Sequence, residues 1–250
     1  MSARQALLIT GASLFALLAG CAAPEKPAGP DPPRQYLVLI PGVEGGAWQL
    51  AAVKDGLHQA GYEGKIEILE WGIRPFGSLI NLTNLPENRK RADKFAARIR
   101  SIKNQYPRCD VTLVGYSGGG GLAALTAERL DAQSKLDRLI LIAAALSPRY
   151  DLTPAMNNSN HGIINFYSPC DSGTLGFGTS VFGTIDRVYT NSAGFVGFQD
   201  ADGHLLQKPG LTQISWEKSW ARLGHWGGHV GWLMAPWTRE ILAPQLKPAA

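Results

Sequence analysis

The sequence predicts an α/β fold in which a mostly parallel sheet is covered by helices on both faces. Short apolar runs of strand length alternate with longer helical segments, an order typical of parallel sheets. The runs are apolar almost throughout, as in strands that are buried on both faces. With 250 residues and 45% hydrophobic side chains, the chain can build one large core but not two comfortable α/β domains.

Six apolar runs have the length of buried strands, and glycine, proline or polar turn residues bound them. Strands are expected over residues 35–40, 65–71, 111–114, 139–145, 163–167 and 211–216. Helices are expected over residues 47–60, 87–106 and 122–130, with a final helix, kinked at Pro236, that runs to about residue 242. Residues 77–86 and 172–210 lack a helical pattern, so they are expected to form irregular segments, with a short hairpin in the second.

The helix expected over residues 87–106 has an apolar stripe and many basic side chains on the rest of its surface. A solvent-facing helix and a helix that rests on anionic lipid would both carry this pattern. The net charge of the whole chain is a modest +4, and its basic residues form no arm with interleaved aromatic residues. Nucleic acid is therefore not an expected partner.

The N-terminus is expected to lie outside the folded domain. Arg4 precedes an apolar segment, residues 6–18, which has the length of a signal peptide and is too short to span a bilayer comfortably. The segment runs into Leu-Ala-Gly-Cys, which ends at Cys21 and resembles the lipobox of bacterial lipoproteins. That resemblance implies cleavage before Cys21, lipidation of its thiol, and a membrane-anchored protein on the periplasmic side of the bacterial cell envelope. In an ordinary signal peptide or an uncleaved anchor, the cysteine would be incidental.

The chain is thus expected to contain a signal peptide over residues 1–20, a tether over residues 21–34 and one domain over residues 35–250. The tether is rich in proline, which favours an extended backbone. Two further cysteines, Cys109 and Cys170, precede and follow different strands, so a parallel sheet would hold them about 15 Å apart. Both are expected to be unpaired, mostly buried thiols.

One apolar run ends in a serine between glycines. Residues 115–119 are Gly-Tyr-Ser-Gly-Gly, which fits the pattern G-x-S-x-G between an expected strand and an expected helix. In that context a strained turn lifts the hydroxyl of Ser117 clear of the sheet, and the glycines let the strand and helix approach. A plain glycine-rich turn with a surface serine has the same pattern, so the rest of the chain must supply a base, an acid and an oxyanion site.

An aspartate and a histidine follow this serine in the order that such a site needs. Asp171 comes just after the strand expected at 163–167, and His229 lies in a Gly-Gly-His-Val-Gly loop before the final helix. In this order and context the chain resembles the α/β-hydrolases over residues 35–242. The resemblance implies that Ser117 is the nucleophile, that His229 is its general base, and that Asp171 orients the imidazole.

Other residues compete for these roles. His225 is a second candidate base, and both histidines could instead be structural. Their His-x-x-x-His spacing would suit a metal pair, but Trp226 stands where the metalloprotease helix motif needs glutamate, so no metal site is expected. The separation of Asp171 from His229 is long for a compact member of the fold, which leaves three further aspartates as candidate acids: Asp186, Asp200 and Asp202.

Two backbone N–H groups should face the oxyanion of a tetrahedral intermediate. The resemblance implies that Gly118 supplies one and Val43, after Pro41-Gly42, the other; many relatives have His-Gly where this chain has Pro-Gly. Only about 25 residues separate the strand ending near residue 145 from Asp171, so a minimal lid is expected. Three tryptophans near the proposed base could line an acyl pocket or pack in the core: Trp226, Trp232 and Trp237.

The resemblance as a whole implies a serine hydrolase that cleaves a small-molecule or lipid ester through an acyl-enzyme, with no metal or organic cofactor. Two alternatives stay open. The same nucleophile could pass the acyl group to an envelope lipid or glycan, which would make the protein an acyltransferase. A non-catalytic lipoprotein could also use a hydrolase scaffold. Neither the substrate nor the oligomeric state can be predicted from the sequence.

Overall fold

A computed structural model describes residues 32–173 and 179–247. In this part of the chain six strands form one sheet in the order β2-β1-β3-β4-β5-β6, and all neighbouring strands are parallel. The strands are β1 (Gln35–Ile40), β2 (Lys65–Ile68), β3 (Asp110–Tyr116), β4 (Arg138–Ile142), β5 (Ile163–Tyr167) and β6 (Leu211–Ser215). The predicted class is confirmed.

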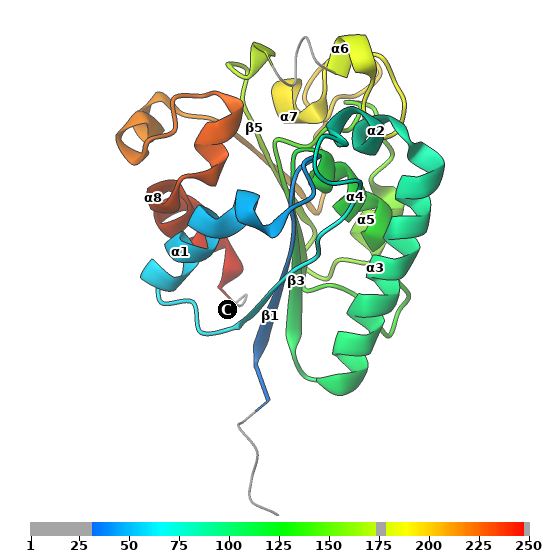
Figure 1. The fold of residues 1–250 in the computed structure, drawn as a ribbon, viewed down its shortest axis with the longest axis vertical. Coiled ribbons are helices and arrows are strands. Elements are labelled where there is room, and N and C mark those ends of the chain that lie inside the picture. The colour runs from blue at the N-terminus through cyan, green and yellow to red at the C-terminus, as the bar shows by residue number, and fades with distance from the viewer. Residues whose placement is uncertain (1–31, 174–178, 248–250) are drawn as a thin grey trace, which may run out of the picture. The chain divides into compact units, whose positions relative to one another are not determined.

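Helices cover both faces of the sheet (Figure 1). The α-helices are α1 (Ala51–Gln59), α2 (Ser78–Thr83), α3 (Leu85–Gln105), α4 (Gly118–Ala127), α5 (Thr153–Asn157), α6 (Thr179–Phe182), α7 (Ala193–Val196) and α8 (Ala235–Trp237). Helices α3, α4 and α5 lie on one face, while α1 and α8 lie on the other (Figure 1). Short 3₁₀ or π-helical turns occupy Ala47–Leu50, Lys218–Leu223, His229–Leu233, Thr238–Leu242 and Ala243–Leu246.

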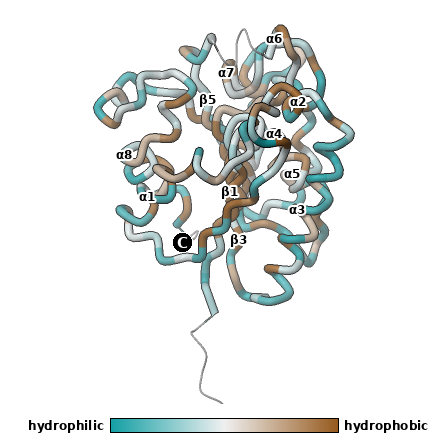
Figure 2. Tube along the Cα trace, in the orientation of Figure 1, coloured by the Kyte–Doolittle hydropathy of each residue, from teal (hydrophilic) through white to brown (hydrophobic). Residues whose placement is uncertain are grey.

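The central strands are buried on both sides, which explains why their sequences are apolar almost throughout. Leu37, Leu113 and Leu139 are all inaccessible to solvent. Hydropathy follows the layers: the central strands are mostly hydrophobic, and α3 contains many hydrophilic residues (Figure 2). Because the strands are parallel, their carboxyl ends lie at one edge of the sheet, and the loops that follow them can contribute to one site.

Several basic side chains of α3 have protein partners. Arg98 donates two hydrogen bonds of 2.8 Å to the carboxylate of Glu67 on β2, and this lowers the pKa of Glu67. Arg100 donates to the carbonyl of Arg129, and Lys103 donates to the carbonyl of Cys109. Part of the basic surface therefore ties the helix to the sheet and to the end of α4.

The helix after Ser117 begins earlier than its sequence predicts. Glycine is a poor helix former, so the expected helix starts at residue 122, whereas α4 begins at Gly118. Tertiary packing explains the difference. A Cβ on Gly119 would lie 2.2 Å from the carbonyl oxygen of Pro41 and 2.5 Å from that of Ile40. Glycine is needed there because the first turn of α4 packs against the end of β1.

Other expectations about local structure need correction. Residues 77–86 were expected to be irregular, but α2 and the start of α3 lie there. Within 172–210 the described residues form α6 and α7, and the expected hairpin is reduced to an isolated antiparallel bridge between Gln199 and Leu205. The single final helix is instead a succession of short 3₁₀, α and π turns. Between β4 and β5 the chain forms only the short helix α5, so the minimal lid is confirmed.

The cysteine expectation is partly wrong. Cys109 and Cys170 are both free, and Cys109 is buried, but Cys170 is exposed because it lies in the loop beyond β5. The predicted signal peptide at residues 1–20, Cys21 and most of the tether lie outside the described residues. Within the described part of the chain, none of the helices combines the length and the hydropathy that a bilayer crossing requires.

The contact at Gly119 predicts that added volume there destabilises the fold. We expect Gly119→Ala to lower the free energy of unfolding by roughly 1–3 kcal/mol or more, because the backbone of the β1 loop must move. Gly173→Ala is the matched control, since a Cβ at that position meets nothing within 4 Å. Urea titration of both variants measures the effect, and equal stabilities would contradict this account.

Candidate active site

Ser117 occupies a strained turn between β3 and α4. Its backbone angles are φ 55° and ψ −123°, a region that a non-glycine residue rarely adopts. Hydrogen bonds on both sides maintain this conformation. The N–H of Ser117 donates to the carbonyl of Ile142 at 2.8 Å, and the carbonyl of Ser117 accepts from the N–H groups of Gly120 and Ala145. The strain is therefore balanced by the strand beside it and by the first turn of the helix.

The structure brings Ser117, His229 and Asp171 into one hydrogen-bonded chain. Nε2 of His229 lies 2.9 Å from Oγ of Ser117, and Nδ1 of His229 lies 2.6 Å from Oδ2 of Asp171. A carboxylate accepts from Nδ1–H, which leaves Nε2 as the acceptor that faces the serine hydroxyl. Asp171 is 3% exposed and Ser117 is 5% exposed, so water competes little for these contacts. The arrangement can move a proton from the hydroxyl to the imidazole.

Two hydrogen bonds that the sequence analysis did not predict hold the histidine loop against the sheet. The hydroxyl of Tyr116 donates to the carbonyl of His229 at 3.1 Å, and its ring centroid lies 5.0 Å from that of the imidazole. Burial, with a smaller effect of the Asp171 charge, raises the pKa of Tyr116, so this phenol stays a donor. Oγ of the buried Ser168 donates to the carbonyl of Gly227 at 2.6 Å. Tyr116 precedes Ser117 and Ser168 follows the strand at 163–167, but the sequence around them does not indicate that they bond to the histidine loop.

The other candidate acids lie elsewhere. Asp186 accepts hydrogen bonds from the N–H and hydroxyl of Ser147, beyond β4. Asp200 accepts from the N–H groups of Asp202 and His204 in an exposed turn. Asp200 therefore has the ordinary role of aspartate in a turn, whereas Asp186 joins its own segment to the chain beyond β4.

His225, the alternative base, is enclosed in a cluster of tryptophans. Its side chain is fully buried, and its ring centroid lies 4.2 Å from that of Trp232. Nδ1 accepts from the N–H of Gly227 at 3.2 Å, while Nε2 has no hydrogen-bond partner among the described residues. Burial lowers the pKa of His225 to about 4. The imidazole is therefore neutral and part of the core.

The loop after β1 approaches the first residue of α4. A Cβ on Gly118 would lie 3.5 Å from the backbone nitrogen of Val43, and a Cβ on Gly42 would lie 3.3 Å from the Cβ of Ser117. Neither Val43 N–H nor Gly118 N–H donates a hydrogen bond to the described part of the chain. Two N–H groups without a partner among the described residues therefore adjoin the turn that contains Ser117.

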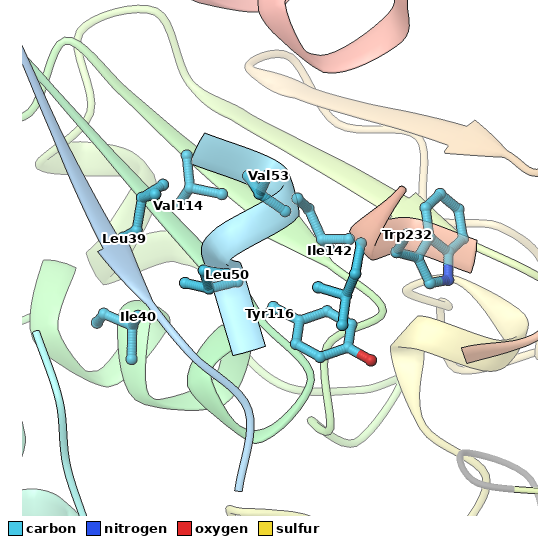
Figure 3. Close-up of a pocket in the computed structure, with 9 residues that line it drawn as sticks. Leu39, Ile40, Leu50, Val53, Val114, Tyr116, Ile142 and Trp232 are labelled. Carbon is cyan, nitrogen blue, oxygen red and sulfur yellow. The ribbon is translucent and has the colours of Figure 1, made fainter. Parts of the chain in front are cut away.

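A small apolar cavity lies between the sheet and the segment of Leu50 and Val53, and Tyr116 forms part of its wall (Figure 3). Its volume is about 10 Å³, close to that of one water-sized sphere, so it is too small for an acyl group. Its lining is Leu39, Ile40, Leu50, Val53, Val114, Tyr116, Ile142, Trp232 and Leu233.

A larger hollow, of about 580 Å³, is lined mainly by residues 147–151 and by Asp186. Tyr150 in its wall donates to Glu128, at the end of α4 farthest from Ser117. None of the three hydrogen-bonded site residues lines it.

The tryptophans near the histidine loop divide between core and surface. Trp232 and Trp237 are fully buried and pack edge to face, with ring centroids 5.2 Å apart. Trp226 is 77% exposed, and Val230, next to His229, is 63% exposed. Only Trp226 of the three is therefore available to a ligand from solvent.

Comparison with known proteins gives one partial family match and several similar structures. A family model described as Lipase (class 3) matches residues 66–157, a range that contains Ser117 but neither Asp171 nor His229. No curated protein matches the chain.

Several of the similar structures span most of this chain. A predicted CIB-like hydrolase from Thermoplasma acidophilum is 14% identical, with a TM-score of 0.47 over 87% of this chain and 88% of the other. The type II thioesterase BorB from the borrelidin biosynthetic cluster is 16% identical, with a TM-score of 0.48 over 89% and 94%. The Bacillus licheniformis lipase BlEst2 is 15% identical, with a TM-score of 0.47 over 88% and 94%.

The buried imidazole of His225 predicts a loss of stability in mild acid. Its pKa is about 4 in the folded protein and about 6.5 in the unfolded chain. Below pH 6.5 the unfolded chain therefore binds a proton that the folded protein does not, and the free energy of unfolding decreases as the pH falls from 6.5 towards 4. This group alone should make the free energy of unfolding about 2 kcal/mol smaller at pH 5 than at pH 7.

Urea titrations of the wild type and His225→Phe at both pH values test this expectation. The variant removes the titrating group, so its stability should change less between pH 7 and pH 5. An identical change in the two proteins would show that His225 is not the source.

Proposed function

We propose that this protein is a serine hydrolase that cleaves a carboxylic ester through an acyl-enzyme. The observation that carries the proposal is the hydrogen-bonded chain from Ser117 through His229 to Asp171. The partial family match is consistent with it, because that match includes the serine and its turn. The serine and the carboxylate are buried, and the imidazole between them is 14% exposed, as a site that reacts with a ligand from solvent requires.

The proposed reaction begins when Oγ of Ser117 attacks the ester carbonyl and Nε2 of His229 takes the hydroxyl proton. Asp171 stabilises the resulting imidazolium and keeps the ring in the required tautomer. The N–H groups of Gly118 and Val43 donate to the oxyanion. The imidazolium then gives its proton to the departing alcohol, and water repeats the sequence to release the carboxylic acid.

Exposed apolar side chains around the site favour a substrate with an apolar group. Val230 follows His229 directly in the chain and Trp226 precedes it by three residues, while Trp48, which is 70% exposed, lies in the 3₁₀ turn that follows the loop of Val43. Phe76, on the neighbouring loop before α2, is 96% exposed. Such side chains gain free energy when they bury hydrocarbon, at about 25 cal/mol for each Å² of apolar surface removed from water.

We also propose that the mature protein is anchored to the membrane of the bacterial envelope, on its periplasmic side, through lipid on Cys21. The resemblance of residues 18–21 to a lipobox supports this, as does the proline-rich tether that follows. The first described residues lead into the amino end of β1, at the sheet edge opposite Ser117.

A fluorophosphonate probe should react covalently with Ser117. We expect Ser117→Ala to abolish labelling and His229→Ala to reduce the turnover of a 4-nitrophenyl ester by roughly 10⁴-fold or more, because the hydroxyl would lack its base. Gel fluorescence and absorbance at the nitrophenolate band provide the two measurements.

His225→Phe serves as the control for the histidine variant, since that ring lies in the core and should not take part in turnover. A folded wild-type protein that neither labels nor hydrolyses the ester would refute the hydrolase. Ester turnover that survives in His229→Ala would assign the base elsewhere.

Lipidation is tested separately. Cells grown with an alkyne fatty acid should incorporate label into the wild type but not into Cys21→Ser, and the variant should leave the membrane fraction. Cys109→Ser is the matched control, because that thiol is buried within the domain. Equal incorporation by Cys21→Ser and the wild type would exclude Cys21 as the modified residue.

A further inference from the structure

The oxyanion loop, residues 41–45, lies between the serine turn and the segment that contains α2. In a trans peptide the C=O and N–H groups point in opposite directions, so the partner of a carbonyl fixes where the N–H of the same peptide points. The peptide between Gly42 and Val43 contains the N–H proposed to bind the oxyanion. Its carbonyl, on Gly42, accepts from the N–H of Gly45 at 2.8 Å, in a tight turn.

The next peptide of the loop is held by a side chain. The carbonyl of Val43 accepts from Nδ2 of Asn81, on α2, at 2.8 Å. The peptide before Gly42 is held in the same way, since the carbonyl of Pro41 accepts from Nε1 of Trp71 at 2.8 Å. Three successive carbonyls thus each accept from a donor within the loop or on a neighbouring segment, and both peptide planes that flank Val43 are fixed.

Asn81 is suited to hold the loop in one position. It is fully buried, and Nδ2 also donates to the carbonyl of Ile73 at 3.1 Å while Oδ1 accepts from the N–H of Ile73 at 2.8 Å. These partners determine which end of the amide is nitrogen, because a carbonyl can accept only from the NH₂ group. Gly72 leaves room for the side chain, since a Cβ there would lie 2.3 Å from Nδ2 of Asn81.

We propose that Asn81 is a positioning residue for the oxyanion site: its hydrogen bond to the carbonyl of Val43 fixes the peptide that follows Val43, and together with the turn between Gly42 and Gly45 it holds the Val43 N–H towards the reacting carbonyl. The inference rests on the proposed function and adds to it a residue that contacts neither the substrate nor the three hydrogen-bonded side chains. It also explains how a loop with Pro-Gly before Val43 keeps its N–H in place. A buried amide with every polar atom paired has little freedom to move, as preorganised stabilisation of an oxyanion requires.

The test separates transition-state stabilisation from ground-state binding. In Asn81→Ala we expect kcat for a 4-nitrophenyl ester, normalised to the serine that the fluorophosphonate probe labels, to fall roughly 10- to 100-fold with KM within about twofold, because the turn that presents the Val43 N–H loses one of its two anchors. Affinity for a trifluoromethyl ketone of the same acyl chain, which forms an oxyanion on Ser117, should fall by a similar factor. Affinity for the unfluorinated ketone should not change.

Asn158→Ala is the matched control. Nδ2 of Asn158 also donates to two backbone carbonyls, those of Ala127 and Leu130, both at 3.0 Å, but it does so at the far end of α4. We expect Asn158→Ala to be less stable than the wild type but to keep its affinity for the trifluoromethyl ketone. If Asn81→Ala does not fold, Asn81→Asp keeps the volume and the acceptor for Ile73 N–H while its ionised form loses the donor, so the same selective loss is expected.

The outcomes distinguish the inference from the function beneath it. The role of Asn81 alone would be overturned if the wild type turns over the ester and the Asn81 variants keep its kcat and its ratio of affinities for the two ketones. An equal loss in Asn158→Ala would also overturn it, since the effect would then be general. A wild type without labelling or turnover would overturn the hydrolase and this inference together.

Discussion

The site depends on how closely the first turn of α4 approaches the end of β1. A Cβ on Gly119 would lie 2.2 Å from the carbonyl oxygen of Pro41, and one on Gly115 would lie 2.3 Å from the carbonyl oxygen of Gly119. With side chains at these positions, the helix could not begin directly after Ser117. The close approach forces Ser117 to a positive φ and brings Gly118 beside the loop of Val43. One steric constraint therefore sets the direction of the hydroxyl and the location of the neighbouring N–H groups.

Around this constraint, buried hydrogen bonds hold segments that the sheet itself does not place. The loop of His229 begins well after β6, so strand register alone does not determine its position. Tyr116 and Ser168, at or just beyond the ends of β3 and β5, donate to carbonyls of that loop. A buried hydroxyl or carbonyl without a partner costs about 1–3 kcal/mol, which penalises conformations in which the loop swings away. Asn81 and Trp71 act in the same way on the loop after β1.

The two histidines have similar sequence contexts, but their imidazole rings lie in different environments. His225 lies among tryptophans, where burial lowers its pKa to about 4 and keeps it neutral. His229, four positions later, has a carboxylate on one nitrogen and a hydroxyl on the other. Gly227 and Gly228 lie between the two rings, and Gly227 adopts φ 90°, so the backbone can turn one ring into the core and the other towards Ser117.

The sequence by itself determined the fold class, four of the six strands to within about two residues at each end, and the turn at Ser117, because burial on both faces and a glycine-bounded serine leave local signals. The strands expected over 65–71 and 139–145 instead end three residues earlier, at Ile68 and Ile142. The sequence named Asp171 and His229, but their order along the chain could not say whether they meet Ser117, nor separate His229 from His225. Those answers depend on contacts between residues more than 50 positions apart. The early start of α4, α2 with its buried Asn81, and the exposure of Cys170 were likewise decided by tertiary structure. Each of these features depends on contacts with residues that are distant in the sequence, and the local sequence does not predict such contacts.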